Sequence, residues 1–546
     1  MHRLFSALVI ILPMAAIPAG GAADSEPLEP LLDGLGDHHH PVTTESEQAQ
    51  RYFDQGLILA FAFNHGEAHR SFMQAAALDP DCAMAWWGAA WVLGPNLNAA
   101  MDLERAPDAW TLLNKAEAAA ERATPREQAY VAALGERYGP EALEDRSPRD
   151  QAFARAMGEV AARYPDDLDA QVIYVEALMD TMPWDYWRDD DESKEATQRV
   201  LQTLDAVLRR APDHPMANHL MIHAVEKVHP AQGLEEAKRL EDLVPGAGHL
   251  VHMPAHIYIR VGRYHDATLA NQRAIAADRR YLEQVDARGV YRLAYMPHNF
   301  HFGWSTASFE GRSELALRLA REMAGMIDAQ AMRQRPLTTL QHYWITPVYG
   351  LVRFGKWDAV LAREEPAEDL IYPRAAWYYA RGLAHARQGR VDAAREALEQ
   401  LDRLRADPSL KWVTVWDINK SRNILEIASL LLTGEIAAVA GDFDTAIASM
   451  ERAAEREDAL TYDEPPTWHY PVRQSLGAVL LMAGRPARAE AVYREDLATF
   501  PDNGWSLFGL LQALRAQGES AEAEDVQRRF REAWRHADVV LTASRF

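Results

Sequence analysis

The sequence contains a single cysteine, Cys82, among its 546 residues. One thiol excludes an internal disulfide framework and any zinc cluster built from several cysteines. Because Cys82 stands beside the apolar residues Met84 and Trp86 in a stretch that predicts helix, we expect it to be a buried core residue.

The sequence also lacks basic runs. It has 57 Lys and Arg against 80 Asp and Glu, which gives a formal net charge of −23. Such a chain repels phosphate backbones, so nucleic acid is not an expected partner. Phosphate-binding loops, the nucleophile elbow and HExxH are missing as well, so phosphate chemistry and the common hydrolase mechanisms lack support.

Long hydrophobic runs are confined to the start of the sequence. One Arg precedes an apolar stretch from Leu4 to Pro18, and small residues follow around Gly21 to Ala23. This order is typical of a secretory signal over residues 1–23, and the alternative is an N-terminal membrane anchor. The stretch is short and broken by proline, which favours the signal. We therefore expect a periplasmic or secreted protein with no membrane span after signal removal.

Runs of alternating β-branched residues are essentially missing, whereas helix formers recur at three- and four-residue spacing, which predicts an all-α fold. Small, aromatic and proline residues then recur as in a tetratricopeptide unit of about 34 residues. The positions in the first unit are Tyr52, Gly56, Ala68, Phe72, Ala75 and Pro80. On these residues the sequence resembles the tetratricopeptide repeat family.

Further units carry the same markers. These are Gly262 with Ala267, Gly311 with Ala316, Gly382 with Gly389, Gly434 with Gly441 and Ala446, Gly477 with Gly484, Ala489, Tyr493 and Pro501, and Gly518 with Ala523. The resemblance implies a tetratricopeptide-type α-solenoid, a right-handed superhelix of antiparallel helix pairs. The stretch from Phe63 to Asn98 also resembles exported bacterial tetratricopeptide proteins. This resemblance does not indicate an activity.

The spacing departs from the repeat at residues 101–163, and an insertion stretches a unit at 279–297. We therefore expect a signal peptide and five segments: 1–23 signal, 24–48 flexible lead, 49–100 N-terminal repeats, 101–164 irregular helices, 165–361 central histidine-rich repeats and 362–546 C-terminal repeats. The run His38, His39 and His40 falls in the lead, from which it could also reach back to the repeats.

Histidines are concentrated in the centre of the sequence. Eleven of the 20 lie between His214 and His342, where an even spread would place about 5. Eight of the eleven fall on the second, fifth or ninth residue of a repeat, and steps of three, four and seven place them on one stripe of a helix. We call this set the histidine stripe: His219, His223, His249, His252, His256, His298, His301 and His342.

In the tetratricopeptide family the stripe positions face the concave groove, where ligands bind. Imidazoles without sulfur ligands suit Zn, Cu, Ni or non-haem Fe, so the stripe predicts a transition-metal site. Two acidic residues share the stripe, Glu226 and Glu176, and are candidate general bases for a metal-dependent enzyme.

Packed helices lie about 8–10 Å apart, so eight histidines on successive repeats cannot share one metal ion. One division places His219, His223, His252 and His256 around one centre, with His249 bridging. A second centre would then lie near His298, His301 and His342.

Two functions follow from these patterns. The first is an exported protein whose groove binds a transition metal, for catalysis or for storage. The alternative is a metal-free scaffold of the cell envelope that holds a peptide, protein or small-molecule ligand in the groove.

Overall fold

The computed structural model describes residues 29–188 and 191–546. This part of the chain is predominantly helical, and its only strands, β1 (Thr414–Val415) and β2 (Asn419–Lys420), form one short antiparallel pair. The all-α fold that the sequence predicts is thereby confirmed. The expected signal at 1–23 lies outside the described residues.

The chain divides into two compact units, which group it differently from the segments suggested by the sequence. Unit 1 extends to Ile257 and includes Arg273–Met296, and unit 2 consists of Tyr258–Gln272 and Pro297–Phe546. The chain changes unit within α12 (Pro254–Arg260), within α13 (Tyr264–Gln284) and at the start of α14 (Met296–Phe309).

The other α-helices of unit 1 are α1 (Glu47–Phe61), α2 (His65–Leu78), α3 (Ala83–Trp91), α4 (Ala106–Ala119), α5 (Pro125–Gly135), α6 (Ser147–Arg163), α7 (Leu168–Asp180), α8 (Glu195–Arg210), α9 (Pro215–Val225), α10 (Leu234–Leu243) and α11 (Gly248–His252). Its short helices are η1 (Leu103–Arg105), η2 (Ala120–Arg122), η3 (Pro230–Gly233) and the π-helical η4 (Tyr291–Tyr295).

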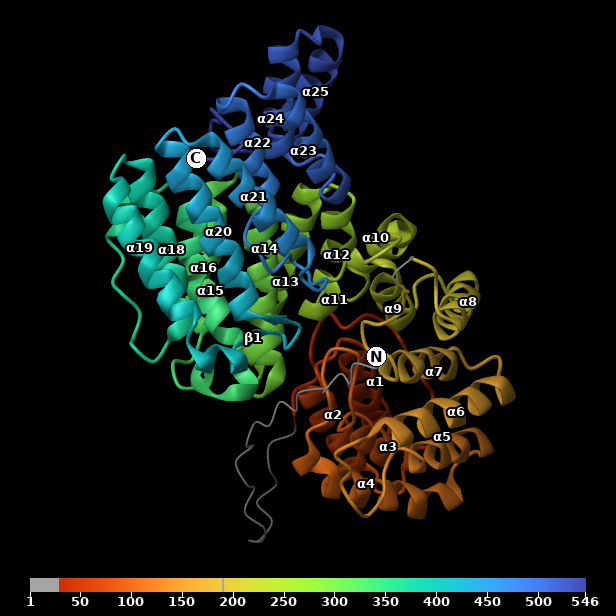
Figure 1. Cartoon of the computed structure of the whole chain (residues 1–546). Helices are drawn as coiled ribbons and strands as arrows, with labels where there is room; N and C mark the ends of the chain where they lie inside the picture. The colour runs from red at the N-terminus through yellow and green to blue at the C-terminus, as the bar shows by residue number, and fades with distance from the viewer. Residues whose placement is uncertain (1–28, 189–190) are drawn as a thin grey trace. The chain divides into compact units, whose positions relative to one another are not determined.

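Unit 2 continues after α14 with α15 (Ser313–Met326), α16 (Thr339–Arg353), α17 (Trp357–Leu361), α18 (Ile371–Arg387), α19 (Val391–Arg405), α20 (Ser421–Val439), α21 (Phe443–Asp458), α22 (Val472–Met482), α23 (Pro486–Thr499), α24 (Gly504–Gln517) and α25 (Ser520–Ala533). Its short helices are η5 (Ala331–Arg333), η6 (Arg335–Leu337) and η7 (Pro408–Trp412). Figure 1 shows α18 to α23 as successive hairpins, and each helix contacts the next along the chain.

Glycines and one aromatic residue set the spacing of the hairpins. The fully buried ring of Phe72 on α2 lies between Gly56 on α1 and Gly88 on α3. A Cβ at Gly56 or Gly88 would stand 2.8 or 2.5 Å from the ring, so only glycine permits this approach. In unit 2, Tyr493 on α23 occupies the same position between two glycines of α22 and α24. The markers Gly56, Phe72, Gly477 and Tyr493 are therefore helix-crossing residues, whereas markers such as Gly389 and Gly441 lie in turns with positive φ.

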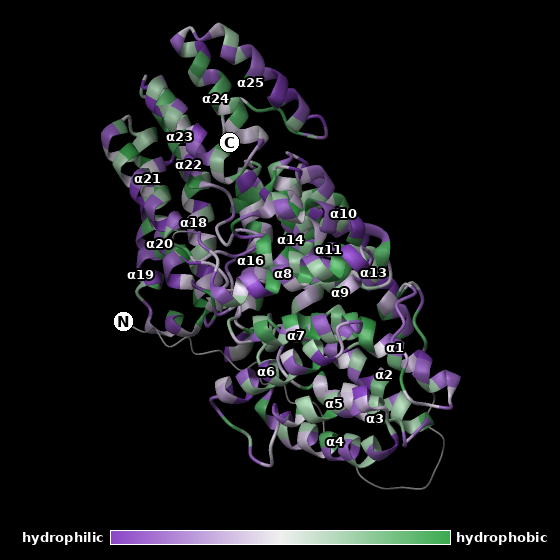
Figure 2. Ribbon diagram, turned by 90° about the vertical axis from the view of Figure 1, so that its right-hand side faces the viewer, coloured by the Kyte–Doolittle hydropathy of each residue, from purple (hydrophilic) through white to green (hydrophobic). Residues whose placement is uncertain are grey.

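The last helix of unit 2 differs from its neighbours in polarity. Only Ala523 and Val526 are buried on α25, and Figure 2 shows mostly hydrophilic residues along it.

Two regions that depart from the repeat pattern have defined structures. Residues 101–163 form α4, α5 and α6 with two short helices, and the insertion at 279–297 contains the end of α13 and the π-helical turn η4. Residues 29–48 of the lead contact helices of unit 1. His38 and His40 both hydrogen-bond to Asp169 on α7, and Gln55 on α1 accepts a hydrogen bond from the backbone of Leu32.

Candidate metal centre

Five histidines of the stripe lie in unit 1, on three helices. Residues 219 and 223 are on α9, 249 and 252 are on α11, and 256 is on α12. Each of these five side chains belongs to a residue that is at most 4% exposed. The sequence predicts an open groove lined by imidazoles, but the structure buries them, so solvent does not satisfy their ring nitrogens.

Three of these imidazoles converge. One ring nitrogen from each of His219, His223 and His249 lies within 4.8 Å of the others. The ring centroid of His219 lies 4.8 Å from that of His223 and 4.9 Å from that of His249. This set is the tri-histidine cluster.

Aromatic rings enclose the tri-histidine cluster. The ring centroid of Phe63 is 4.5 Å from that of His219, the ring of Trp184 is 5.2 Å from His223, and the ring of Tyr295 is 4.9 Å from His249. An ion at this position would therefore be surrounded by imidazole nitrogen and apolar surface.

The proton positions on two imidazoles follow from their hydrogen bonds. The Nδ1–H of His219 donates to the backbone carbonyl of Phe61 at 2.8 Å, and the Nδ1–H of His223 donates to Glu226 at 2.9 Å. Because both partners can only accept, each neutral ring carries its free electron pair on Nε2. Within the described residues these two Nε2 atoms, and both ring nitrogens of His249, have no hydrogen-bond partner.

Glu226 orients two histidines at once. Its second carboxylate oxygen accepts a hydrogen bond from Nδ1 of His256 at 2.5 Å. Burial alone would raise the pKa of Glu226, but His256 and His223 outweigh it and lower the pKa to about 2. A carboxylate that is ionised and engaged through both oxygens has little affinity for another proton. Its geometry fits an orienting role instead of the general base that we expected.

The imidazoles of the cluster are neutral at pH 7. Burial lowers the pKa of His219 and of His249 well below the usual value, and the neighbouring imidazoles lower both further. Burial also lowers the pKa of His223, against the opposing effect of Glu226. Neutral imidazole is the form that binds a metal ion, so protons do not compete for these nitrogens at pH 7.

The remaining two histidines of unit 1 form a pair beside the cluster. The Nε2 atoms of His252 and His256 lie 2.9 Å apart, and the ring centroid of His252 is 6.0 Å from that of His249. The structure thus groups His249 with His219 and His223, whereas the division suggested by the sequence placed His252 and His256 with them.

The other three histidines of the stripe belong to unit 2. The rings of His301 and His342 are 5.3 Å apart, and Nδ1 of His342 hydrogen-bonds to the hydroxyl of Tyr372 at 2.6 Å. The ring of His298 packs against Phe302. Within residues 29–188 and 191–546, neither His301 nor His342 belongs to a convergent group of three metal-ligating side chains.

Glu176, the second expected base, lies on α7 next to a buried ion pair. Arg137 contacts Asp180 there at 2.6 Å. Burial and the adjacent Asp180 raise the pKa of Glu176 well above the usual value. The role of Glu176 as a general base stays a prediction.

A second histidine cluster, not predicted as a site, gathers around Asp169. His38 and His214 approach one oxygen of this carboxylate at 2.9 and 3.1 Å, and His40 approaches the other at 2.7 Å. Burial would raise the pKa of Asp169, but the three histidines lower it well below the usual value. These atoms are also close enough to hold a metal ion.

The position of the ring proton on His214 distinguishes the Asp169 cluster from the tri-histidine cluster. Its Nδ1 accepts a hydrogen bond from the backbone of Ala217 and caps α9, so the ring proton is on Nε2, which donates to Asp169. In the Asp169 cluster the proton of His214 thus points to the carboxylate, while the tri-histidine cluster presents free electron pairs. The run of three histidines before Pro41 was its only signal in the sequence.

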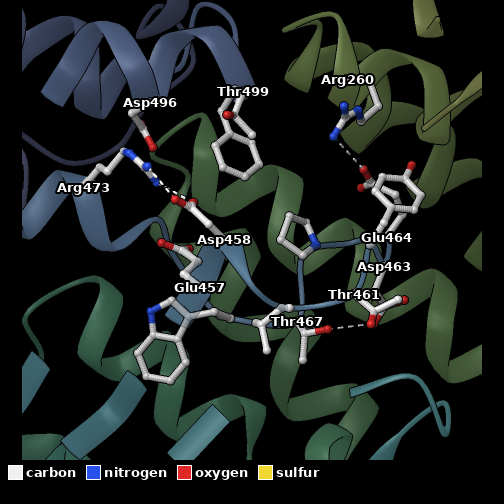
Figure 3. Close-up of a pocket in the computed structure, with 15 residues that line it drawn as sticks. Arg260, Glu457, Asp458, Thr461, Asp463, Glu464, Thr467, Arg473, Asp496 and Thr499 are labelled. Atoms are coloured by element: carbon white, nitrogen blue, oxygen red, sulfur yellow. Dashed lines mark hydrogen bonds and ion pairs between the residues drawn. The ribbon is translucent and has the colours of Figure 1, made fainter. Parts of the chain in front are cut away.

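A pocket in unit 2 offers a different chemistry. Figure 3 shows the residues that line a pocket between the loop before α22 and the end of α23. The volume of this pocket is about 260 Å³. Its carboxylates have partners, since Asp458 pairs with Arg473 at 2.7 Å and Glu464 pairs with Arg260 at 3.7 Å. Burial raises the pKa of Glu457 in the same wall to about 8. Paired or protonated carboxyls give this pocket little attraction for a metal ion.

Comparisons with known proteins support the fold. Residues 376–408, which cover most of α18 and α19, match the family model described as "Tetratricopeptide repeat". This segment of the chain is thus similar to a tetratricopeptide repeat. No curated protein matches the sequence.

Among solved structures, the chain is similar to the APC/C hetero-tetramer Cut9-Hcn1, with 13% identity, 89% of this chain and 94% of that chain covered, and a TM-score of 0.29. It is similar to the human IFIT1 dimer with m7Gppp-AAAA, with 12% identity, 90% and 91% covered, and a TM-score of 0.27. Likeness at this level carries no argument about function. Among the described residues, no helix has both the length and the hydrophobicity to cross a membrane.

Proposed function

We propose that this chain is a transition-metal-binding protein whose ion is held in unit 1 by His219, His223 and His249. The observation that carries the proposal is the set of buried ring nitrogens that have free electron pairs and no hydrogen-bond partner. A buried polar atom without a partner costs about 1–3 kcal/mol, and coordination to a cation would offset that cost.

The surroundings of the ligands support the same proposal. Metal-bound histidines usually donate their other ring N–H to a carboxylate or a backbone carbonyl, which fixes the ring and its tautomer. Glu226 and the carbonyl of Phe61 act in this way here. The set contains three nitrogens and no sulfur, which suits Zn²⁺ or Cu²⁺, or non-haem iron, and leaves a fourth position for water or a substrate.

Metal content tests this proposal. The full-length chain, purified from its native compartment without a histidine tag, should contain a stoichiometric transition metal, and the apoprotein should bind Zn²⁺ or Cu²⁺ in calorimetric titrations. The double substitution His223→Ala with His249→Ala should abolish binding. His69→Ala is the control, because His69 also lies in unit 1 and hydrogen-bonds to a backbone carbonyl but is outside the cluster.

A second candidate function rests on the repeat itself. The match over residues 376–408 lies in unit 2, and tetratricopeptide scaffolds hold protein or peptide partners. A chain that contains no metal and shows no metal-dependent rise in melting temperature would favour this scaffold function.

We also propose export to the periplasm or the exterior, on the evidence of residues 1–23 alone. A C-terminally tagged precursor should yield an extracytoplasmic product shortened near Ala23. Uncleaved material in the membrane fraction would contradict export by a cleaved signal.

A further inference from the structure

Three arginines and one glutamate surround a small cavity in unit 2. Arg353 ends α16, Arg387 ends α18 and Glu435 lies on α20, and Arg545 directly precedes Phe546. Arg353, Glu435 and Arg545 are 4%, 1% and 8% exposed. The charges are therefore held away from bulk solvent.

The positive charges of this group exceed the negative ones. Arg387 and Arg545 both contact the same oxygen of Glu435, at 2.9 and 3.0 Å. Arg353 donates to the side chain of Gln474 at 2.7 Å and stacks on Trp505 at 3.6 Å. Within the described residues, Glu435 is the only carboxylate that pairs with these guanidiniums. One negative charge thus faces three positive ones.

This excess is costly because arginine does not lose its proton near neutral pH. Burial lowers the pKa of Arg353 to about 9, and burial with the repulsion of Arg387 lowers the pKa of Arg545 to about 10. The buried Nε–H groups of Arg353 and Arg387 also have no acceptor in the described part of the chain. A buried charge in such surroundings requires a counter-charge.

We propose that this cavity binds a small inorganic anion of the size of chloride, held by Arg353, Arg387 and Arg545. The cavity volume is about 10 Å³, which restricts the ligand to a single small species. Phosphate and sulfate, with five heavy atoms each, are too large for it. The anion neutralises part of the excess charge and supplies the acceptor that the two Nε–H groups lack.

The site also fixes the last residues of the sequence to the repeats. Ser544 donates to the backbone carbonyl of Gln474 at 2.6 Å, and the ring of Phe546 lies 5.6 Å from that of Trp505. Arg545 stands between these anchors and reaches Glu435. Anion binding therefore links α16, α18 and α20 to residues 544–546.

The test compares thermal unfolding of the full chain in sodium chloride and in sodium gluconate at equal ionic strength. Chloride should raise the melting temperature of unit 2 by about 3–6 °C for each tenfold increase above its Kd, and gluconate should not. Arg387→Gln should remove the chloride effect. Arg374→Gln is the control, because Arg374 lies on the same helix but pairs with the exposed Glu365. This variant should retain the chloride effect.

Crystals grown in sodium bromide give a readout that does not depend on the variants. An anomalous bromide peak between the three guanidiniums is the expected result. Equal melting temperatures in chloride and gluconate, together with no bromide peak at this place, would overturn the proposal.

Discussion

Two clusters of the same residue types differ in where their protons lie. In the tri-histidine cluster, Nδ1–H groups donate outward to Phe61 and Glu226 and leave Nε2 free. Around Asp169, imidazole N–H groups point inward to a carboxylate. Hydrogen-bond partners outside each cluster thus decide whether histidines present electron pairs to a cation or protons to an anion.

Glu226→Gln should weaken metal binding about 10- to 100-fold. An amide has one oxygen, so it cannot accept from both His223 and His256, and one of these rings must change its tautomer. Isothermal titration with Zn²⁺ measures the change. Glu176→Gln is the matched control, since Glu176 is also a buried carboxyl of unit 1 but lies outside the tri-histidine cluster. Equal affinities for both variants would contradict the orienting role.

Glu457→Gln should change the pH dependence of stability. Burial raises the pKa of this carboxyl from 4.5 to about 8, so the folded chain holds its proton more tightly than the unfolded chain. The wild type therefore loses stability as the pH rises from 4.5 towards 8, and the amide does not.

Melting curves at pH 5 and pH 8 test this sign. The melting temperature of the variant, compared with that of the wild type, should be higher at pH 8 than at pH 5. Glu455→Gln, an exposed position on the same helix, should show no such difference. If the difference in melting temperature between variant and wild type is the same at both pH values, Glu457 does not cause the pH dependence.

At the scale of the element, the unit of packing is one aromatic ring between two glycines of the neighbouring helices. Gly88→Ala should destabilise unit 1 by about 1–3 kcal/mol, because the new methyl group would stand 2.5 Å from the buried ring of Phe72. The better helix propensity of Ala recovers at most about 1 kcal/mol.

Gly325→Ala on α15 separates packing from propensity. A Cβ at Gly325 has no atom within 4 Å, so this substitution should stabilise the chain slightly. Urea unfolding curves of both variants give the comparison, and a loss of stability in Gly325→Ala as large as in Gly88→Ala would contradict the packing argument.

The sequence predicts these elements well because the helix crossing demands particular residue types at fixed spacing. Gly56 and Phe72 mark the first hairpin, and Gly477 and Tyr493 mark a later one, in the positions where the structure packs them. The spacing along α9 likewise predicts that His219 and His223 share one face.

The rest of the site depends on contacts that sequence spacing does not contain. The carbonyl that orients His219 belongs to Phe61, 158 residues earlier, and any residue type could supply it. Asp169 is 129 residues from His40. The burial of the histidine stripe could not be predicted from the sequence either. The 3.6-residue period shows which residues share a helix face, but it does not show what covers that face.

At the scale of the molecule, the histidine stripe is shared between two units. Three of its members, His298, His301 and His342, belong to unit 2, while the tri-histidine cluster lies wholly in unit 1. Metal binding should therefore act locally on unit 1.

Hydrogen–deuterium exchange tests this locality. Added Zn²⁺ should increase amide protection in α9, α11 and α12 and leave α20 to α25 unchanged, because binding stabilises the folded state of the segment that holds the ligands. In His223→Ala with His249→Ala, the added protection should disappear. Protection that rises equally in both units would place the ion elsewhere.

X-ray absorption at the metal edge, on the full chain loaded with one equivalent of Zn²⁺, tests the central claim most directly. We expect at least three imidazole nitrogens at about 2.0–2.1 Å and no sulfur. In His219→Ala with His223→Ala and His249→Ala, this signal should vanish, and in His69→Ala it should persist. A zinc spectrum dominated by water or carboxylate oxygen in the parent chain would contradict a metal centre built from these histidines.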